Sequence, residues 1–233
     1  MLSFRSPGLR LPTIMPTIAL LHTSAVHEPT FRKLIEDRSP DVHQRHTVRG
    51  DWLDAARSGG LTEDLRQTVH DFLLAEKGRA DAVLCTCSTL GPLVDSVPGD
   101  GVPVIRIDRP MMAAAVATGG PVLIAYCLES TREPTLALFD DVVASAGGSC
   151  AVNTVFCDGT WTHFESGAID AFAKAIASSV RKTAEDLGPL SAIVLAQASM
   201  APAAGHLADL GIPVLSSPAP AVEAALKQAG SAT

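Results

Sequence analysis

Short apolar runs recur along the chain, and a loop or turn follows each of them. Residues 82–85 and 193–196 are apolar at nearly every position, where a strand with one face in water would alternate with polar residues. Such runs predict parallel strands that are covered on both faces. Between them, apolar residues recur at three- and four-residue steps over 61–76 and 169–182, which predicts amphipathic helices.

The same order of segments occurs twice in the sequence. Residues 16–21 resemble 121–126, and at the same offset of 105 residues, 28–31 resemble 133–136. Self-similarity at a long, nearly constant offset indicates a duplicated structural unit, here of about 105 residues. Further matches at offsets of 109 and 110 pair Trp52 with Trp161, 80–92 with 190–202, and 101–105 with 211–215.

Each unit is predicted to run strand, helix, strand, helix, strand, short helix, strand, helix. The fold class expected is therefore α/β, with two similar lobes related by a pseudo-twofold axis. Each lobe has a parallel four-stranded sheet flanked by helices. Ligands of open parallel sheets bind beyond the carboxyl ends of the strands, so the active site is expected in the cleft between the lobes.

Composition restricts the possible partners. The formal charge is −7, and no basic run is present to neutralise a nucleic acid or an anionic membrane. No apolar run reaches the roughly 18 residues that a membrane span needs. We expect a cytoplasmic protein that binds neither nucleic acid nor membrane. Residues 1–14 carry two arginines and no acid, and are interpreted as a flexible extension rather than a fragment of a targeting peptide.

Four loops are expected to meet in the cleft. Loop 22–27 is expected to meet its match in the repeat, loop 128–132, and loop 87–90 is expected to meet loop 197–200. Cys87 follows a strand and precedes a predicted helix start rich in hydroxyls, a position that favours the thiolate and binds anions. The alternative is that Cys87 is a small buried hydrophobic residue.

The other cysteines are interpreted as structural. Cys85 is expected to point into packing, although a redox pair with Cys87 stays open. Cys127 is expected in the core, with a place in the cleft as the alternative. Cys150 and Cys157 are expected to be buried on the strand that matches 42–48. The spacing matches no zinc site, so no metal is expected.

The segment Cys87-Ser88-Thr89 and its mirror loop give the chain a resemblance to the aspartate/glutamate racemase superfamily over nearly its whole length. This superfamily includes hydantoin racemase, maleate isomerase and arylmalonate decarboxylase. The resemblance implies two α/β lobes, no cofactor, and a substrate carboxylate held between two cysteine-bearing loops. It also implies a homo-oligomer, a dimer or larger, and a lobe division of 15–115 plus 219–233 against 116–218.

The chain departs from this family pattern at Gln197, which stands where the second cysteine is usual. An amide neither accepts nor releases a proton near neutral pH, so a symmetrical two-thiol reaction cannot run. His22 is a candidate for the missing acid or base, with a hydrogen-bonded loop histidine as the alternative. The substrate-binding candidates are Thr23, Ser24, Ser88, Thr89, Ser130, Thr131, Gln197, Ala198 and Ser199.

These residues predict a cofactor-independent racemase or epimerase acting at the carbon α to the carboxylate of an amino acid or related small acid, with Cys87 as the catalytic thiol. Two alternatives stay open. One is a single-cysteine decarboxylase or cis-trans isomerase of a small dicarboxylate, and the other is a carboxylate-binding protein without activity.

Overall fold

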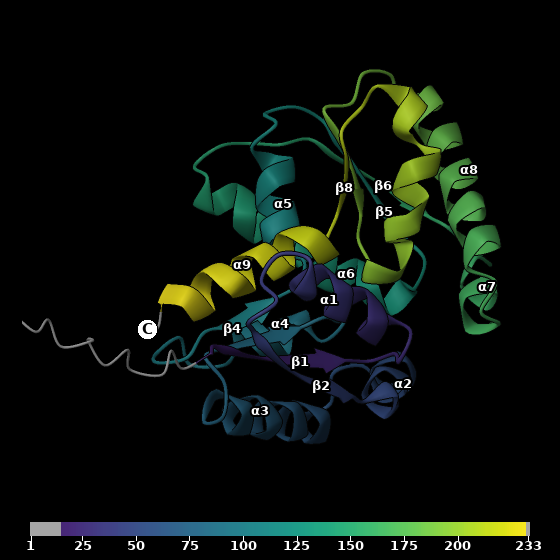
Figure 1. Cartoon of the computed structure of the whole chain (residues 1–233). Helices are drawn as coiled ribbons and strands as arrows, with labels where there is room; N and C mark the ends of the chain where they lie inside the picture. Colours follow the sequence, from purple (N-terminus) through teal and green to yellow (C-terminus); the bar gives the residue numbers. More distant parts are fainter. Residues whose placement is uncertain (1–14, 232–233) are drawn as a thin grey trace, which may run out of the picture.

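The computed structural model describes residues 15–231, which form two four-stranded parallel sheets, one in each half of the chain (Figure 1). The predicted extension, 1–14, lies outside the described residues. The first sheet has the order β2-β1-β3-β4, and the second has the matching order β6-β5-β7-β8. The predicted α/β fold with two parallel sheets is therefore confirmed. The strands are β1 (Thr17–His22), β2 (His43–Val48), β3 (Ala82–Cys85), β4 (Val104–Arg106), β5 (Val122–Tyr126), β6 (Val152–Phe156), β7 (Ala192–Leu195) and β8 (Val214–Ser216).

The central strands follow from their composition. Every residue of β3, β5 and β7 is buried, as expected for apolar strands with helices on both faces. The edge strand β2, with the sequence HQRHTV, is only partly buried and is correspondingly polar. The first-half helices are α1 (His27–Glu36), α2 (Gly50–Gly59), α3 (Glu63–Lys77), α4 (Gly91–Asp95) and α5 (Arg109–Val116). The second half has α6 (Glu129–Ser145), α7 (Trp161–Glu165), α8 (Ile169–Leu187), the 3₁₀ helices η1 (Ala198–His206) and η2 (Ala208–Leu210), and α9 (Pro218–Ser231).

Between its second and third strands, each half contains one helix more than the pattern predicts. Two helices, not one, connect the second and third strands, and the extra helices, α2 and α7, carry the two tryptophans near their starts. In α2, Trp52, Leu53 and Ala56 face the core, and in α7 only Phe164 is buried. Helices this short repeat the apolar spacing too few times for periodicity to reveal them.

The last helix of each half packs on the other half. Helix α5 buries Met111, Met112 and Ala115 in a cluster with residues of β5, α6 and β7. Helix α9 buries four residues, among them Val222, in a cluster with residues of β1, β3 and α1. The predicted division places α5 in the first lobe, whereas its side chains contribute to the core of the second. Helices α5 and α9 also contact each other between the two sheets (Figure 1). This exchange ties the halves together and fixes how their strand ends face one another.

Within residues 15–231, no helix is long and apolar enough to cross a membrane.

Candidate active site

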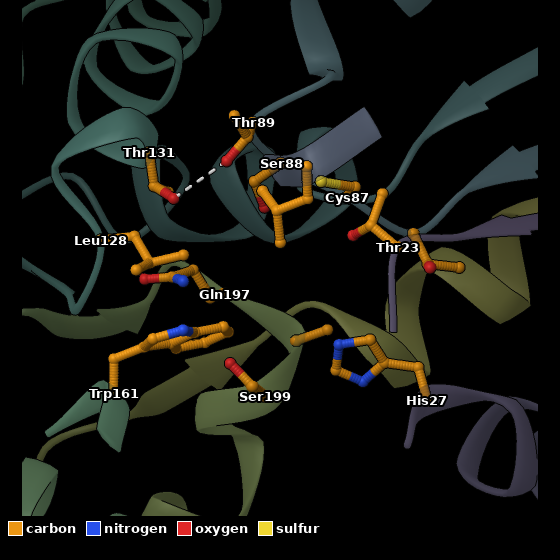
Figure 2. A pocket seen from close by; sticks show the side chains of 13 residues that line it. Thr23, His27, Cys87, Ser88, Thr89, Leu128, Thr131, Trp161, Gln197 and Ser199 are labelled. Atoms are coloured by element: carbon orange, nitrogen blue, oxygen red, sulfur yellow. Dashed lines mark hydrogen bonds between the residues drawn. The ribbon is translucent and has the colours of Figure 1, made fainter. Parts of the chain in front are cut away.

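A cavity lies where loops from the two sheets meet (Figure 2). The first half contributes the loops after β1 and β3 together with α2, and the second contributes those after β5, β6 and β7. The cavity is narrow, with a volume of about 30 Å³. It is lined by Thr23, His27, Leu53, Thr86, Cys87, Ser88, Thr89, Leu128, Thr131, Trp161, Gln197, Ala198 and Ser199.

Cys87 lies two residues beyond the end of β3, with its sulfur in the cavity wall (Figure 2). The Thr23 hydroxyl and the backbone N–H groups of Thr89 and Leu90 hydrogen-bond this sulfur, and each lowers the pKa of the thiol. Burial acts in the opposite direction and outweighs them, so the pKa of Cys87 is raised. The expected donors are present, but the expected preference for the thiolate is wrong for the unliganded site, where the thiol is the resting form.

Hydroxyl groups from both halves converge beside Cys87. Thr89, ahead of α4, and Thr131, in the first turn of α6, place their Oγ1 atoms 3.2 Å apart, and both side chains are buried. The Ser88 hydroxyl donates to the carbonyl oxygen of Ala196 at 2.9 Å, so Ser88 also links the two halves. Ser199, at the start of η1, lines the opposite side of the cavity (Figure 2). Because the one O–H of Ser88 is used on the Ala196 carbonyl, the hydroxyls of Thr89, Thr131 and Ser199 are the ones placed to meet an anion.

Gln197 is held in one orientation by Cys127. Its Oε1 atom accepts a hydrogen bond from the Cys127 backbone N–H at 2.7 Å and another from the thiol at 3.1 Å. The amide nitrogen is therefore the end of the side chain that faces the cavity (Figure 2). Cys127 itself is buried and does not line the cavity. Burial raises the pKa of its thiol. The mirror position of Cys87 thus presents a neutral N–H donor.

His22 does not reach the cavity. It is the last residue of β1 and is fully buried. Its Nδ1 atom is 2.9 Å from Thr86 Oγ1, and its Nε2 atom is 2.8 Å from His46 Nδ1. Burial, reinforced by repulsion from His46 and His27, lowers its pKa to about 3, so the ring is neutral. The structure places His22 as a hydrogen-bonded support for the strand end, without access to a substrate in this cavity.

Two other candidates also lie outside the cavity lining. Ser24 borders a neighbouring groove that it shares with Thr23 and Trp161. Ser130 borders another cavity, and its buried Oγ atom has no hydrogen-bond partner within the part of the chain that the structure describes. The structure brings together the remaining eight: Thr23, Cys87, Ser88, Thr89, Thr131, Gln197, Ala198 and Ser199.

Five lining residues were not candidates from the sequence: His27, Leu53, Thr86, Leu128 and Trp161. The loop predicted over 22–27 ends on His27, which lines the cavity, whereas the candidate His22 at the strand end does not. Trp161 stacks on Phe164, and its indole N–H donates to Glu165 at 2.8 Å. Its partner in the repeat, Trp52, is instead buried in the first-half core.

The cavity is electrically neutral at rest. Its lining contains no Lys, Arg, Asp or Glu residue. Burial lowers the pKa of His27 to about 4, which leaves the imidazole uncharged near neutral pH. An anion bound here would be held by hydroxyls and amides rather than by an opposite charge.

The remaining cysteines differ in burial. Cys85 and Cys157 are fully buried, as expected. Cys150 is only partly buried and precedes β6, so its expected burial on that strand is wrong. Among the described residues, no group of three or more His, Cys, Asp or Glu side chains is placed to hold a metal ion.

A model of the Asp/Glu/Hydantoin racemase family matches residues 18–225, nearly the whole described chain. The protein therefore belongs to the Asp/Glu/hydantoin racemase family, and so to a family of enzymes. A search of curated proteins found no match.

Solved structures of related fold include racemases and a decarboxylase. Aspartate racemase from Picrophilus torridus has a TM-score of 0.65 at 13% identity, with 92% of this chain and 94% of that chain covered. Allantoin racemase from Klebsiella pneumoniae has a TM-score of 0.62 at 16% identity, with 92% and 88% covered. A glycine-to-cysteine mutant of arylmalonate decarboxylase, in a sulfate-associated form, has a TM-score of 0.58 at 16% identity, with 94% and 95% covered. At these identities the likeness shows a shared fold.

Proposed function

We propose that this protein is a cofactor-independent racemase or epimerase that acts at the carbon α to a carboxylate of an amino acid or related small acid. Cys87 is the group that moves a proton at this carbon. The observation that carries the proposal is the position of the Cys87 sulfur in a cavity between the two halves, beside hydroxyls supplied by both.

The substrate carboxylate is held by the hydroxyls of Thr89, Thr131 and Ser199 and by the amide nitrogen of Gln197. Transfer of the α proton to a base on the face opposite Cys87 leaves the C–H electron pair on carbon and spreads negative charge onto the carboxylate oxygens. Donors fixed in place before the reaction stabilise that charge more than water does. The Cys87 thiol then gives its proton to the carbon, and the thiolate that remains is stabilised by Thr23 and two backbone N–H groups.

Decarboxylation of a small dicarboxylate is the second candidate. It is favoured by Gln197, which removes the second thiol, and by the raised pKa of Cys87, which suits a proton donor. In this reaction the bond to the departing carboxylate breaks, its electron pair stays on carbon, and the thiol proton completes the product. Only one face of the carbon needs a proton donor.

The two reactions are separated by one set of incubations in deuterated water. The compounds are the separate enantiomers of aspartate and glutamate, together with phenylmalonate. Deuterium at the α carbon with inversion supports the racemase, and release of carbon dioxide from phenylmalonate supports the decarboxylase. A compound that raises the melting temperature but shows neither reaction would support a carboxylate-binding protein and contradict the proposal.

A further inference from the structure

We infer that His27 is the second catalytic residue, which transfers a proton on the face of the substrate carbon opposite Cys87. The inference rests on the proposed function, because inversion requires one proton-transfer group on each face of a planar carbanion.

The geometry places His27 across the cavity from Cys87. His27 is the first residue of α1, and its ring stacks on Phe164 of α7 with centroids 5.9 Å apart and planes 28° apart. Figure 2 shows the imidazole on the Ser199 side of the cavity, with the Cys87 sulfur on the far side. A substrate carbon between them has one face toward sulfur and the other toward a ring nitrogen.

No other lining residue can take this role. Cys87 and His27 are the only residues of the cavity lining with ionisable side chains. The Gln197 side chain is an amide, which does not transfer a proton. Cys127 does not line the cavity, and its thiol donates a hydrogen bond to Gln197 Oε1. His22 is bonded to Thr86 and His46 and does not line the cavity.

The resting protonation states suit the pair. Burial keeps the His27 imidazole neutral and the Cys87 thiol protonated, so one can accept a proton and the other can give one. For one enantiomer, His27 takes the α proton, the C–H electron pair stays on carbon, and the thiol proton adds on the opposite face. The imidazolium and thiolate that remain carry out the reverse sequence on the other enantiomer. The bound carboxylate favours the imidazolium, which makes His27 a stronger base once the substrate is present.

A neighbouring cavity also borders His27. This space is lined by Thr30, Pro202 and other residues of α1 and η1, and His27, Ala198 and Ser199 line both cavities. The ring is thus part of the wall between them. This position gives the imidazole a second side on which to exchange its proton between turnovers.

The first test follows each enantiomer separately with His27→Gln, Cys87→Ala and a control, His163→Gln, whose exposed side chain lies outside the cavity. For His27→Gln we expect inversion to fall at least about 100-fold, with deuterium exchange retained for the one enantiomer whose α proton faces Cys87. Cys87→Ala should show the opposite enantiomer preference. Inversion at the wild-type rate in His27→Gln, with Cys87→Ala inactive, would overturn the role of His27 alone. Full activity in Cys87→Ala would overturn the proposed function.

The second test needs no known substrate. Bromoacetate places a carboxylate on the hydroxyls and a reactive methylene where the α carbon belongs. In Cys87→Ala protein, a His27 nitrogen should displace bromide and form a carbon–nitrogen bond, at least about tenfold faster than the more exposed His163 and His206 react. Mass spectrometry locates the label. A rate at His27 no higher than at these two histidines would contradict the inference.

Discussion

Gln197 accepts two hydrogen bonds from Cys127, one from the backbone N–H at 2.7 Å and one from the thiol at 3.1 Å. Together they orient the amide nitrogen into the cavity, at the position that mirrors Cys87 in the repeat. The two sheets have matching strand orders, but the site between them is chemically unequal. One side carries a thiol, and its mirror position carries a fixed donor that can bind a carboxylate but cannot move a proton.

Replacement of Gln197 by Glu tests this binding role. The new carboxylate still accepts from Cys127, but it removes the N–H donor and adds a negative charge beside the substrate carboxylate. We expect KM to rise tenfold or more, the equivalent of about 1.4 kcal/mol, in steady-state kinetics. Gln228→Glu, on an exposed face of α9, is the matched control and should leave KM unchanged. An unchanged KM in Gln197→Glu would remove Gln197 from the binding site.

Two threonines of α6 provide a matched pair. Thr131 places its hydroxyl 3.2 Å from that of Thr89 in the cavity, whereas the buried Thr135 hydroxyl has no partner among the described residues. Thr131→Val should lower kcat/KM about tenfold. Thr135→Val should leave kcat/KM unchanged and keep or slightly raise the free energy of unfolding, because it removes an unsatisfied buried polar group. Equal kinetic effects of the two substitutions would show that Thr131 has no special role.

Stability should fall as the solution becomes acidic, partly through His22. Its pKa is about 3 in the folded protein and near 6.5 in the unfolded chain, so only the unfolded chain takes up this proton between these values. The contribution is fully present above pH 6.5 and is lost as the pH falls toward 3, by roughly 1 kcal/mol per pH unit. Urea unfolding at pH 7 and pH 5 should show a smaller difference for His22→Gln than for the wild type. The partly exposed His70 supplies the control substitution, and a pH dependence identical in His22→Gln and wild type would contradict this assignment.

A buried arginine links the halves behind the site. Arg106 bonds the fully buried Asp108 at 2.7 Å and donates to the Pro134 carbonyl oxygen of α6 at 2.8 Å. Arg106→Met leaves Asp108 without its cation and should lower the free energy of unfolding by about 3 kcal/mol. The half-exposed Arg109, paired with Asp141, is the matched control, and Arg109→Met should cost under about 1 kcal/mol. Urea unfolding measures both, and similar losses would show that the buried network is not special.

The two parallel sheets could be predicted from the sequence because their central strands are apolar at nearly every position and recur in the repeat. The sequence also predicted that Cys87, Thr89 and Gln197, which follow strand ends, would lie together in the cavity lining. The short helices α2 and α7 could not be predicted because each contains too few repeats of the apolar spacing. The packing of α5 on the opposite sheet depends on contacts between distant segments, which local patterns do not record.

The two histidines near the end of β1 illustrate the same limit. The sequence makes His22 the candidate acid or base, and His27, five residues further along, is not among the candidates. The fold turns the first ring toward His46 and leaves it out of the cavity lining, and it places the second, at the start of α1, in the lining together with Cys87. Likewise, the thiolate expected from local donors is disfavoured by burial, which only the packed structure reveals.

The most direct measurement of the central claim is the rate of racemisation at the α carbon, for the compound that the wild type turns over fastest. The comparison is between wild type, Cys87→Ala and the control Cys150→Ala, whose partly buried thiol lies outside the cavity. We predict that Cys87→Ala loses racemisation by at least about 100-fold while Cys150→Ala keeps the wild-type rate. Wild-type racemisation in Cys87→Ala would contradict the assignment of Cys87 as the proton-transfer group.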